Sequence, residues 1–168
     1  METEPASASM SQGQAAVLTA EQIAAMDGLD YLHGLVAGRY AHPPMAALTG
    51  YRLVRVARGE VAIRAIAEAR HRNPMGGVHG GWYGAVLDSV LGCAVMTGVR
   101  AGHWYTTLEY KINLTRAVPV GLEVEAVGTL RHAGRSTGVS DAVLRGVADG
   151  RVYATGSTTC LIMPAAAG

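Results

Sequence analysis

Apolar residues follow a helical period near the start of the chain and a strand period over most of the rest. Thr19 stands three residues before Gln22, the spacing of a capping box at a helix start. The apolar positions that follow share one helix face: Ile23, Met26, Leu29, Leu32 and Leu35. We expect this helix to end at His42-Pro43-Pro44, because proline disfavours helical geometry in the residue before it.

Alternation of apolar and polar residues predicts β-strands from Tyr51 onward. Residues 51–57 and 61–69 are expected to form a hairpin joined by Arg58-Gly59-Glu60. In residues 107–115 the alternation places Leu108, Tyr110, Ile112 and Leu114 on one face and Thr107 on the other. Asp149-Gly150 is a strong hairpin signal. The remaining expected strands are 122–131, 137–147 and 151–163.

One long apolar segment interrupts the strands, from about Gly80 to Gly98. The run from Val78 to Val99 also holds His79, Asp88, Ser89 and five glycines, which argues against a membrane span. A helix that is apolar nearly all round must be covered on most sides, and a curled antiparallel sheet would cover it. The sequence therefore predicts an α+β domain in which the last four strands form a meander.

Composition narrows the class of protein. The chain has 168 residues, 49% apolar and 16% charged, with a net charge of +1 and no basic stripe for nucleic acid or a membrane surface. We expect a disordered tail over residues 1–16 and one domain over 17–168. Cys93 and Cys160 lie in apolar segments, and the N-terminus has no secretory signal, so we expect reduced thiols in a cytoplasmic protein. The sequence contains no metal-ligand spacing and no cofactor-binding motif, so we expect no bound metal ion and no cofactor.

Asp88 is the most informative residue in the sequence. It is the only acidic or basic residue between Arg72 and Arg100, in the middle of the apolar helix. Burying a lone carboxylate costs several kcal/mol unless it is paired, hydrogen-bonded or neutralised. A structural role is one explanation. The interpretation we favour is a carboxylate kept for acid/base or nucleophilic chemistry.

His79-Gly80-Gly81 marks the start of the same helix, where backbone N–H groups and the positive end of the helix dipole meet. Such a site could stabilise the oxyanion of a thioester under attack. Gly80 and Asp88 are eight residues apart, or about 12 Å along the axis, so they cannot act on one carbonyl within a single chain. If this chemistry is real, two antiparallel helices across a two-fold axis are required.

Two further motifs allow more than one interpretation. Asn73 could hold a carboxylate, water or thioester oxygen through its amide, or act only as a turn residue before Pro74. Gly134-Arg135-Ser136-Thr137-Gly138 has the pattern of a serine hydrolase, but it lies between strands and no histidine follows it, so we reject a serine nucleophile here. Cys93, five residues past Asp88, is expected to point elsewhere on the helix and to pack in the core.

The segment from Asn73 to Gly81, then Asp88, then Thr106-Thr107-Leu108-Glu109-Tyr110-Lys111-Ile112-Asn113-Leu114, resembles the hotdog-fold acyl-CoA thioesterases, with the phenylacetate-degradation type most similar. The resemblance runs from about Tyr51 to Met163. It implies a long helix wrapped by an antiparallel sheet, homodimers joined sheet to sheet, and dimers that pair into tetramers.

By position, the resemblance makes Asp88 the nucleophile or the base that activates water. Gly80 would supply the N–H that polarises the carbonyl. His79 and Asn73 would support substrate and water, Gly81 would contact substrate, and Thr107 would lie near the reacting centre. Some relatives have Glu at the acid position and Thr one turn later; here these are Asp88 and Gly92, which favours the Asp-type branch.

Coenzyme A carries phosphates, and Arg116, Arg131 and Arg135 lie near strand ends where they could meet them, although an ordinary solvated surface arginine is the more common case for each. By resemblance, Arg135-Ser136 is the strongest of these substrate-binding candidates. We therefore expect hydrolysis of an acyl-CoA to a free acid and CoA. The alternatives are a non-catalytic acyl-CoA-binding module, a hydratase or dehydratase on the same fold, and a structural oligomer.

Overall fold

A computed structural model describes residues 15–165 of the protein. Within that range the helices are α1 (Ala20–Ala24), α2 (Gly28–Val36), α3 (Pro44–Thr49), the 3-10 helix η1 (Ala69–His71) and α4 (Gly80–Met96). The strands are β1 (Tyr51–Ala57), β2 (Glu60–Ile66), β3 (His103–Leu114), β4 (Glu123–Ala133), β5 (Thr137–Gly146) and β6 (Val152–Pro164). Most of the expected tail, residues 1–14, lies outside the described residues.

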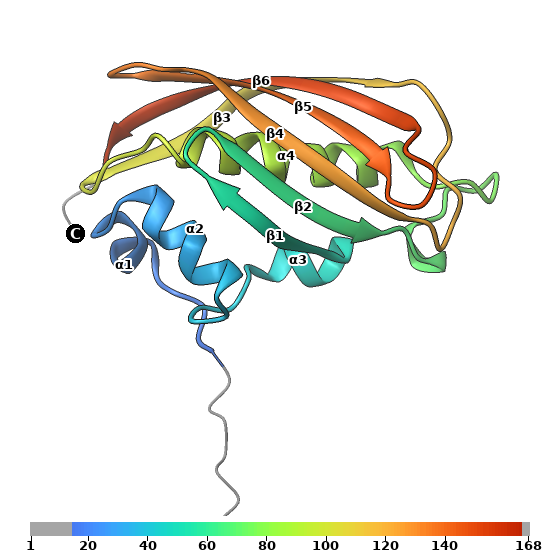
Figure 1. Ribbon diagram of the computed structural model, residues 1–168, viewed down its shortest axis with the longest axis horizontal. Coiled ribbons are helices and arrows are strands. Elements are labelled where there is room, and N and C mark those ends of the chain that lie inside the picture. Colours follow the sequence, from blue (N-terminus) through green and yellow to red (C-terminus); the bar gives the residue numbers. More distant parts are fainter. Residues whose placement is uncertain (1–14, 166–168) are drawn as a thin grey trace, which may run out of the picture.

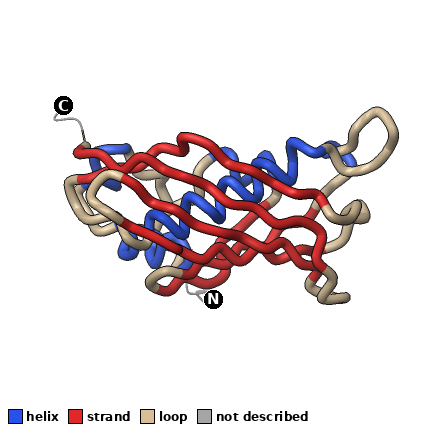
Figure 2. Tube along the Cα trace, turned by 90° about the horizontal axis from the view of Figure 1, so that it is seen from above, coloured by secondary structure: helices blue, strands red, loops and turns tan. Residues whose placement is uncertain are grey.

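The strands form one antiparallel sheet in the order β1-β2-β4-β5-β6-β3. The sheet arches over α4, and its strands cross the helix when seen from above (Figures 1 and 2). This is the predicted α+β architecture of a helix wrapped by a curved antiparallel sheet. The predicted meander of four strands is wrong at one point. β4, β5 and β6 follow one another, but β3 pairs with β6 at the sheet edge instead of with β4.

Helix α4 is the centre of the core, as its all-round apolar sequence predicts. Val86, Leu87, Val90 and Leu91 are fully buried. Glycines let the aromatic side chains of β3 come very close to this helix. A Cβ at Gly92 would stand 2.5 Å from the hydroxyl of Tyr105, and one at Gly84 would stand 3.0 Å from the hydroxyl of Tyr110. The ring of Tyr105 therefore packs against α4 at Gly92. No helix in residues 15–165 is long and apolar enough to cross a membrane.

A bulge in β3 corrects the face assignment made from the sequence. The pairing with β6 shifts between Thr107 and Glu109, so Leu108 is the extra residue. Thr107 hydrogen-bonds to α4, and Tyr110 also lies against that helix. Both side chains therefore share one face, whereas simple alternation placed them on opposite faces. One extra residue in a strand reverses the alternation beyond it.

The N-terminal helix is divided, in contrast to the single helix expected from the sequence. The capping box of Thr19 and Gln22 forms as predicted at the start of α1. The chain then leaves helical geometry before Asp27, whose extended backbone precedes α2. Pro44 begins the short helix α3 instead of only ending the preceding one, because proline suits the first helical position.

Candidate active site

Asp88 lies on α4, half-buried, where the helix faces β3. The hydroxyl of Thr107 donates a hydrogen bond to Oδ1 of Asp88 at 3.1 Å. Burial raises the pKa of the Asp88 carboxyl above its ordinary value, while the hydrogen bond from Thr107 opposes that rise. Desolvation is the larger effect. No cationic side chain contributes to this balance, so Asp88 is a carboxyl without a salt bridge among the described residues.

A cavity of about 340 Å³ adjoins Asp88. Its walls come from α4, β1, β3 and the N-terminal segment 17–35. The cavity is mostly aliphatic on the N-terminal side, where its lining comprises Val17, Leu18, Ile23, Tyr31, Leu32 and Leu35. The carboxyl therefore faces a mostly apolar space, in keeping with the burial that raises its pKa.

Cys93 lines the same cavity as Asp88, which contradicts the expectation that it points elsewhere on the helix. At 100° per residue, Asp88, Ser89, Cys93 and Met96 fall within one broad face of α4. All four side chains line the cavity. Burial raises the pKa of the Cys93 thiol to about 12, so the thiol is neutral at physiological pH.

The His79-Gly80-Gly81 motif forms the N-terminus of α4. His79 is the N-cap residue, and its Nδ1 accepts a hydrogen bond from the backbone N–H of Gly81 at 2.9 Å. The N–H of Gly81 is thereby satisfied within the chain. The N–H of Gly80 has no hydrogen-bond acceptor among residues 15–165. Of the two glycines that the sequence offered for substrate contact, Gly80 is the one with an available donor.

Asn73 organises the loop before α4. Its Oδ1 accepts hydrogen bonds from the backbone N–H groups of Met75 at 3.0 Å and Gly77 at 3.1 Å. Its own backbone N–H donates to the carbonyl of Gly77 at 2.7 Å. The structure therefore gives Asn73 the turn role that the sequence left as one of two interpretations. The amide oxygen is occupied, and only the NH₂ group remains for a substrate or water.

Gly80 and Asp88 are both on α4, with two turns of helix between them. One chain thus presents an acid at mid-helix and an open backbone donor at the helix start, about 12 Å apart. No group of three or more His, Cys, Asp or Glu side chains in residues 15–165 is arranged to hold a metal ion.

Comparison with known proteins identifies the family. The family profile described as Thioesterase superfamily matches residues 75–153, which hold Gly80, Asp88 and Thr107. A conserved protein from Pseudomonas aeruginosa is 31% identical, with a TM-score of 0.67 over 73% of this chain and 95% of its own. A phenylacetic acid degradation-related protein from Ralstonia eutropha is 26% identical, with a TM-score of 0.71 over 78% and 98%.

The chain belongs to the thioesterase superfamily. Its fold is the hotdog fold of those relatives, and the resemblance to the phenylacetate-degradation type is confirmed. A hypothetical thioesterase protein from Streptococcus pneumoniae, solved with coenzyme A, shares this fold with a TM-score of 0.65 at 22% identity, over 73% of this chain and 94% of its own. No curated protein sequence matched the chain.

The arginines proposed from the sequence differ in their surroundings. Arg131 forms a salt bridge of 2.8 Å with Asp141, so its charge is already paired. Arg116, just after β3, is exposed, and Ser136 offers its backbone carbonyl to the N–H of Ile162. Arg135 lines a second cavity, of about 390 Å³, at the C-terminal end of α4.

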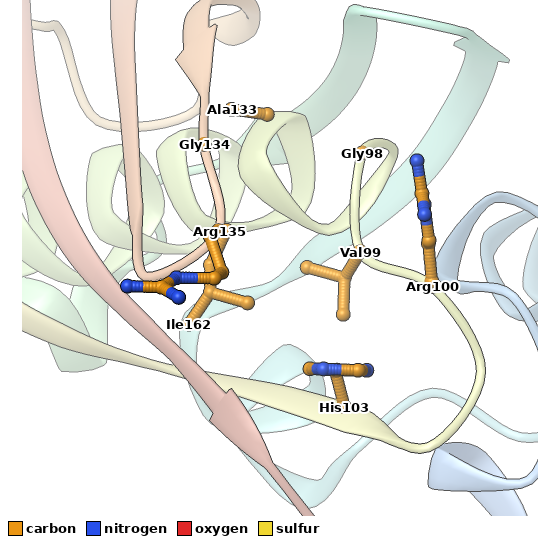
Figure 3. Close-up of a pocket in the computed structure, with 8 residues that line it drawn as sticks. All are labelled: Gly98, Val99, Arg100, His103, Ala133, Gly134, Arg135 and Ile162. Carbon is orange, nitrogen blue, oxygen red and sulfur yellow. The ribbon is translucent and has the colours of Figure 1, made fainter.

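Figure 3 shows Arg135 on one side of Val99 in this second cavity and Arg100 on the other, with His103 nearby. Neither arginine has a salt bridge among the described residues. Arg100 and His103 were missed in the sequence because nothing in a loop and a strand start marks them as neighbours of Arg135. The cavity is a basic hollow separate from the one that Asp88 lines.

The hydrogen bond between Thr107 and Asp88 gives a prediction on pH dependence. Thr107→Val keeps the shape but removes the donor that lowers the pKa of Asp88, so this pKa rises further. If Asp88 acts as the carboxylate, the acid limb of kcat/KM moves to higher pH. Since a hydrogen bond to a charged group contributes about 1.5–3 kcal/mol, we expect about a tenfold or larger loss at acid pH. Thr107→Ser keeps a hydroxyl and should return the acid limb of the kcat/KM profile to its position in the parent protein. An acid limb that does not move in Thr107→Val would show that this hydrogen bond does not affect the pKa of Asp88.

Proposed function

We propose that the protein hydrolyses an acyl-CoA to a free acid and CoA. The observation that carries this proposal is Asp88, a carboxyl without a salt bridge that faces a cavity and accepts a hydrogen bond from Thr107. Burial raises its pKa, which makes it a stronger base than an ordinary aspartate once it is ionised. Superfamily membership and the coenzyme A bound to the Streptococcus pneumoniae protein support the same substrate class.

The chemistry requires a new C–O bond and the loss of the C–S bond. Asp88 either takes a proton from water as the water attacks the carbonyl, or attacks the carbonyl itself and is released by water afterwards. In both routes the carbonyl oxygen becomes an oxyanion, the C–S bond then breaks, and the CoA sulfur leaves and takes up a proton. The backbone N–H of Gly80, at the positive end of α4, is the group we assign to the oxyanion.

His79 supports this assignment through its contact with Gly81. Because Nδ1 accepts the Gly81 N–H, a neutral imidazole carries its proton on Nε2. That N–H is then available to donate to a substrate oxygen. The NH₂ group of Asn73 offers a second donor on the same approach to the helix.

Within one chain, Gly80 and Asp88 are about 12 Å apart along α4, too far to act on the same carbonyl. We therefore propose that the active site lies between two protomers. The edge strand β3 supports this arrangement, because it is the longest exposed edge in the described sheet and a ready template for pairing. Its side chains Leu108, Tyr110 and Leu114 are 58%, 46% and 48% exposed. Pairing β3 with its two-fold copy would cover them and join the two sheets. Such dimers could pair further into tetramers.

Arg135 is the side chain we assign to a phosphate of coenzyme A, together with Arg100 and His103 in the same hollow. Because a hydrogen bond to a charged group contributes about 1.5–3 kcal/mol, Arg135→Ala should raise KM for an acyl-CoA about tenfold or more and leave kcat nearly unchanged. The matched substrate is the same acyl group on pantetheine, which lacks the nucleotide phosphates and should be hydrolysed equally by both proteins. An equal loss on both thioesters would rule out phosphate binding by Arg135.

Thiol release from a panel of acetyl-, medium-chain, long-chain and aryl-CoA thioesters tests the proposed function. Turnover that Asp88→Asn abolishes would support it. If no thioester is hydrolysed but acyl-CoA binds, the protein is a non-catalytic acyl-CoA-binding module instead. Incubation with enoyl-CoA distinguishes the hydratase alternative, which would show loss of the conjugated double bond without thiol release.

A further inference from the structure

The length and the lining of the cavity beside Asp88 indicate which acyl group the substrate carries. The cavity follows α4 from Asp88 to Met96, both of which line it. Eight residues of helix correspond to about 12 Å. A fully extended chain advances about 1.2 Å per bond, so about ten carbons span this distance.

The volume of the cavity agrees with its length. A cavity of about 150 Å³ is known to accept benzene, which has six carbons. At about 340 Å³, the space beside Asp88 has room for roughly twice that number. A two-carbon acyl group would leave most of the cavity unfilled, and a sixteen-carbon chain would exceed it.

The lining is uncharged apart from Asp88. Burial raises the pKa of Tyr31 and of Cys93 to about 12, so both side chains are neutral at physiological pH. Burial also raises the pKa of Tyr51 and of Tyr105. No lysine or arginine lines the cavity, within the part of the chain that the structure describes. An acyl group with a terminal carboxylate would find no partner there and would lose its hydration.

The N-terminal segment 17–35 closes this cavity and is tied firmly to the rest of the domain. The N–H of Gly28 donates to the carbonyl of Val99 at 2.9 Å, and the N–H of Gly102 donates to the carbonyl of Ala24 at 2.7 Å. The side chain of Asp27 accepts the N–H of Ala101 at 2.8 Å. These contacts bind the segment to the loop between α4 and β3. The wall that this segment contributes to the cavity is therefore fixed to the rest of the domain.

We propose that this cavity binds the acyl chain of the substrate, and that the protein selects an uncharged chain of about eight to ten carbons. This inference rests on the proposed function and names its substrate class. The carbonyl carbon lies beside Asp88, and the chain runs along α4 past Cys93 toward Met96. The segment 17–35 supplies the aliphatic wall that covers it.

The chain-length profile of kcat/KM tests this proposal. Each added methylene should raise kcat/KM about threefold to fourfold up to about ten carbons, because burying one methylene contributes about 0.8 kcal/mol. Longer chains should react more slowly. Suberyl-CoA, which has eight carbons and a terminal carboxylate, should react at least a hundredfold more slowly than octanoyl-CoA. A maximum at acetyl-CoA or palmitoyl-CoA, or a preference for phenylacetyl-CoA over octanoyl-CoA, would overturn the proposal.

Substitutions along α4 provide a second test. Cys93 lies about 7.5 Å from Asp88 along the helix axis, the length of about six carbons. Cys93→Leu should shift the preferred chain to about six carbons, measured as a higher ratio of kcat/KM for hexanoyl-CoA to kcat/KM for octanoyl-CoA. Met96→Ala should shift it to longer chains. The matched control is Val36→Leu, on α2 but outside the cavity, which should leave the profile unchanged.

Binding to Asp88→Asn separates this proposal from the proposed function. Trp104 lines the cavity, so its fluorescence should change when octanoyl-CoA binds and much less with CoA alone. Adding Cys93→Leu to this variant should remove most of the difference. If octanoyl-CoA binds in this way but is not hydrolysed by the parent protein, the chain site stands and the hydrolase proposal fails. If hydrolysis occurs with no dependence on chain length or on Cys93, the hydrolase proposal stands and the chain site fails.

Discussion

Asp88→Asn lowers kcat for acyl-CoA hydrolysis by about a hundredfold to ten-thousandfold, the range that a positioned acid or base contributes. The substitution keeps the shape of the side chain and still accepts the hydrogen bond from Thr107 through its amide oxygen. It removes only the ability to take a proton or attack a carbonyl. Because ground-state contacts are retained, KM should change little. Thiol release under saturating substrate measures the effect.

The stability of the same variant provides its control. The folded state raises the pKa of Asp88, so it binds this proton more tightly than the unfolded state does. The protonated carboxyl of Asp88 therefore contributes to the stability of the folded state. This contribution is fully present below the pKa that Asp88 has in the unfolded chain, and it is lost as pH rises through its pKa in the folded protein. Above the folded pKa the ionised carboxyl lowers the stability of the folded state, so Asp88→Asn should have an equal or higher free energy of unfolding than the parent. Lost activity with lost stability would instead indicate a structural role.

Gly80→Pro lowers kcat by about a hundredfold to a thousandfold, the usual loss on removing one oxyanion donor. Gly80 is the first residue of α4, a position that proline favours because its missing N–H makes no helical hydrogen bond. The preceding residue, His79, has the extended backbone that a following proline requires, with φ −64° and ψ 136°. Among the described residues, and apart from its chain neighbours and its own helix backbone, an added Cβ would have only Cδ1 of Leu114 within 4 Å, at 3.7 Å. Gly80→Ala adds the same carbon but keeps the N–H, so it should retain far more activity.

Mixing the two inactive variants tests whether the site lies between protomers. In a heterodimer of Asp88→Asn with Gly80→Pro, one site carries both defects and the other carries neither. A statistical mixture of refolded or co-expressed chains should therefore regain about a quarter of the parent activity. If Gly80 and Asp88 acted within one chain, every site would keep a defect and the mixture would stay inactive. Light scattering that showed an active monomer would contradict the proposed dimer independently.

Much of the fold could be predicted from the spacing of apolar residues alone. The alternation in residues 51–66 and 123–164 predicted β1, β2, β4, β5 and β6 to within a few residues, because each strand buries one face on a common core. The apolar run after Gly80 predicted α4 because few strands reach such a length. Asp149-Gly150 predicted the hairpin between β5 and β6, where Gly150 adopts a φ of +65°.

Local pattern could not predict which strands become neighbours. β3 pairs with β6, more than 40 positions later, because the sheet must close over α4 from both sides. The bulge at Leu108 likewise depends on the partner strand. Without it, Thr107 and Tyr110 would lie on opposite faces of β3, as simple alternation predicted, and only one of them could face α4.

The sequence by itself determined which residues are chemically unusual: a lone carboxyl in an apolar helix at Asp88, and glycines at the helix start at Gly80. These follow from the cost of burying charge and from the open N–H groups of a helix end, both of which are local properties. Only the tertiary structure decided that Asp88 faces a cavity, that Cys93 shares it, and that the segment 17–35 closes it. A cavity is the space left between elements distant in sequence, so its size and lining depend on how those elements pack and not on the pattern within any one of them.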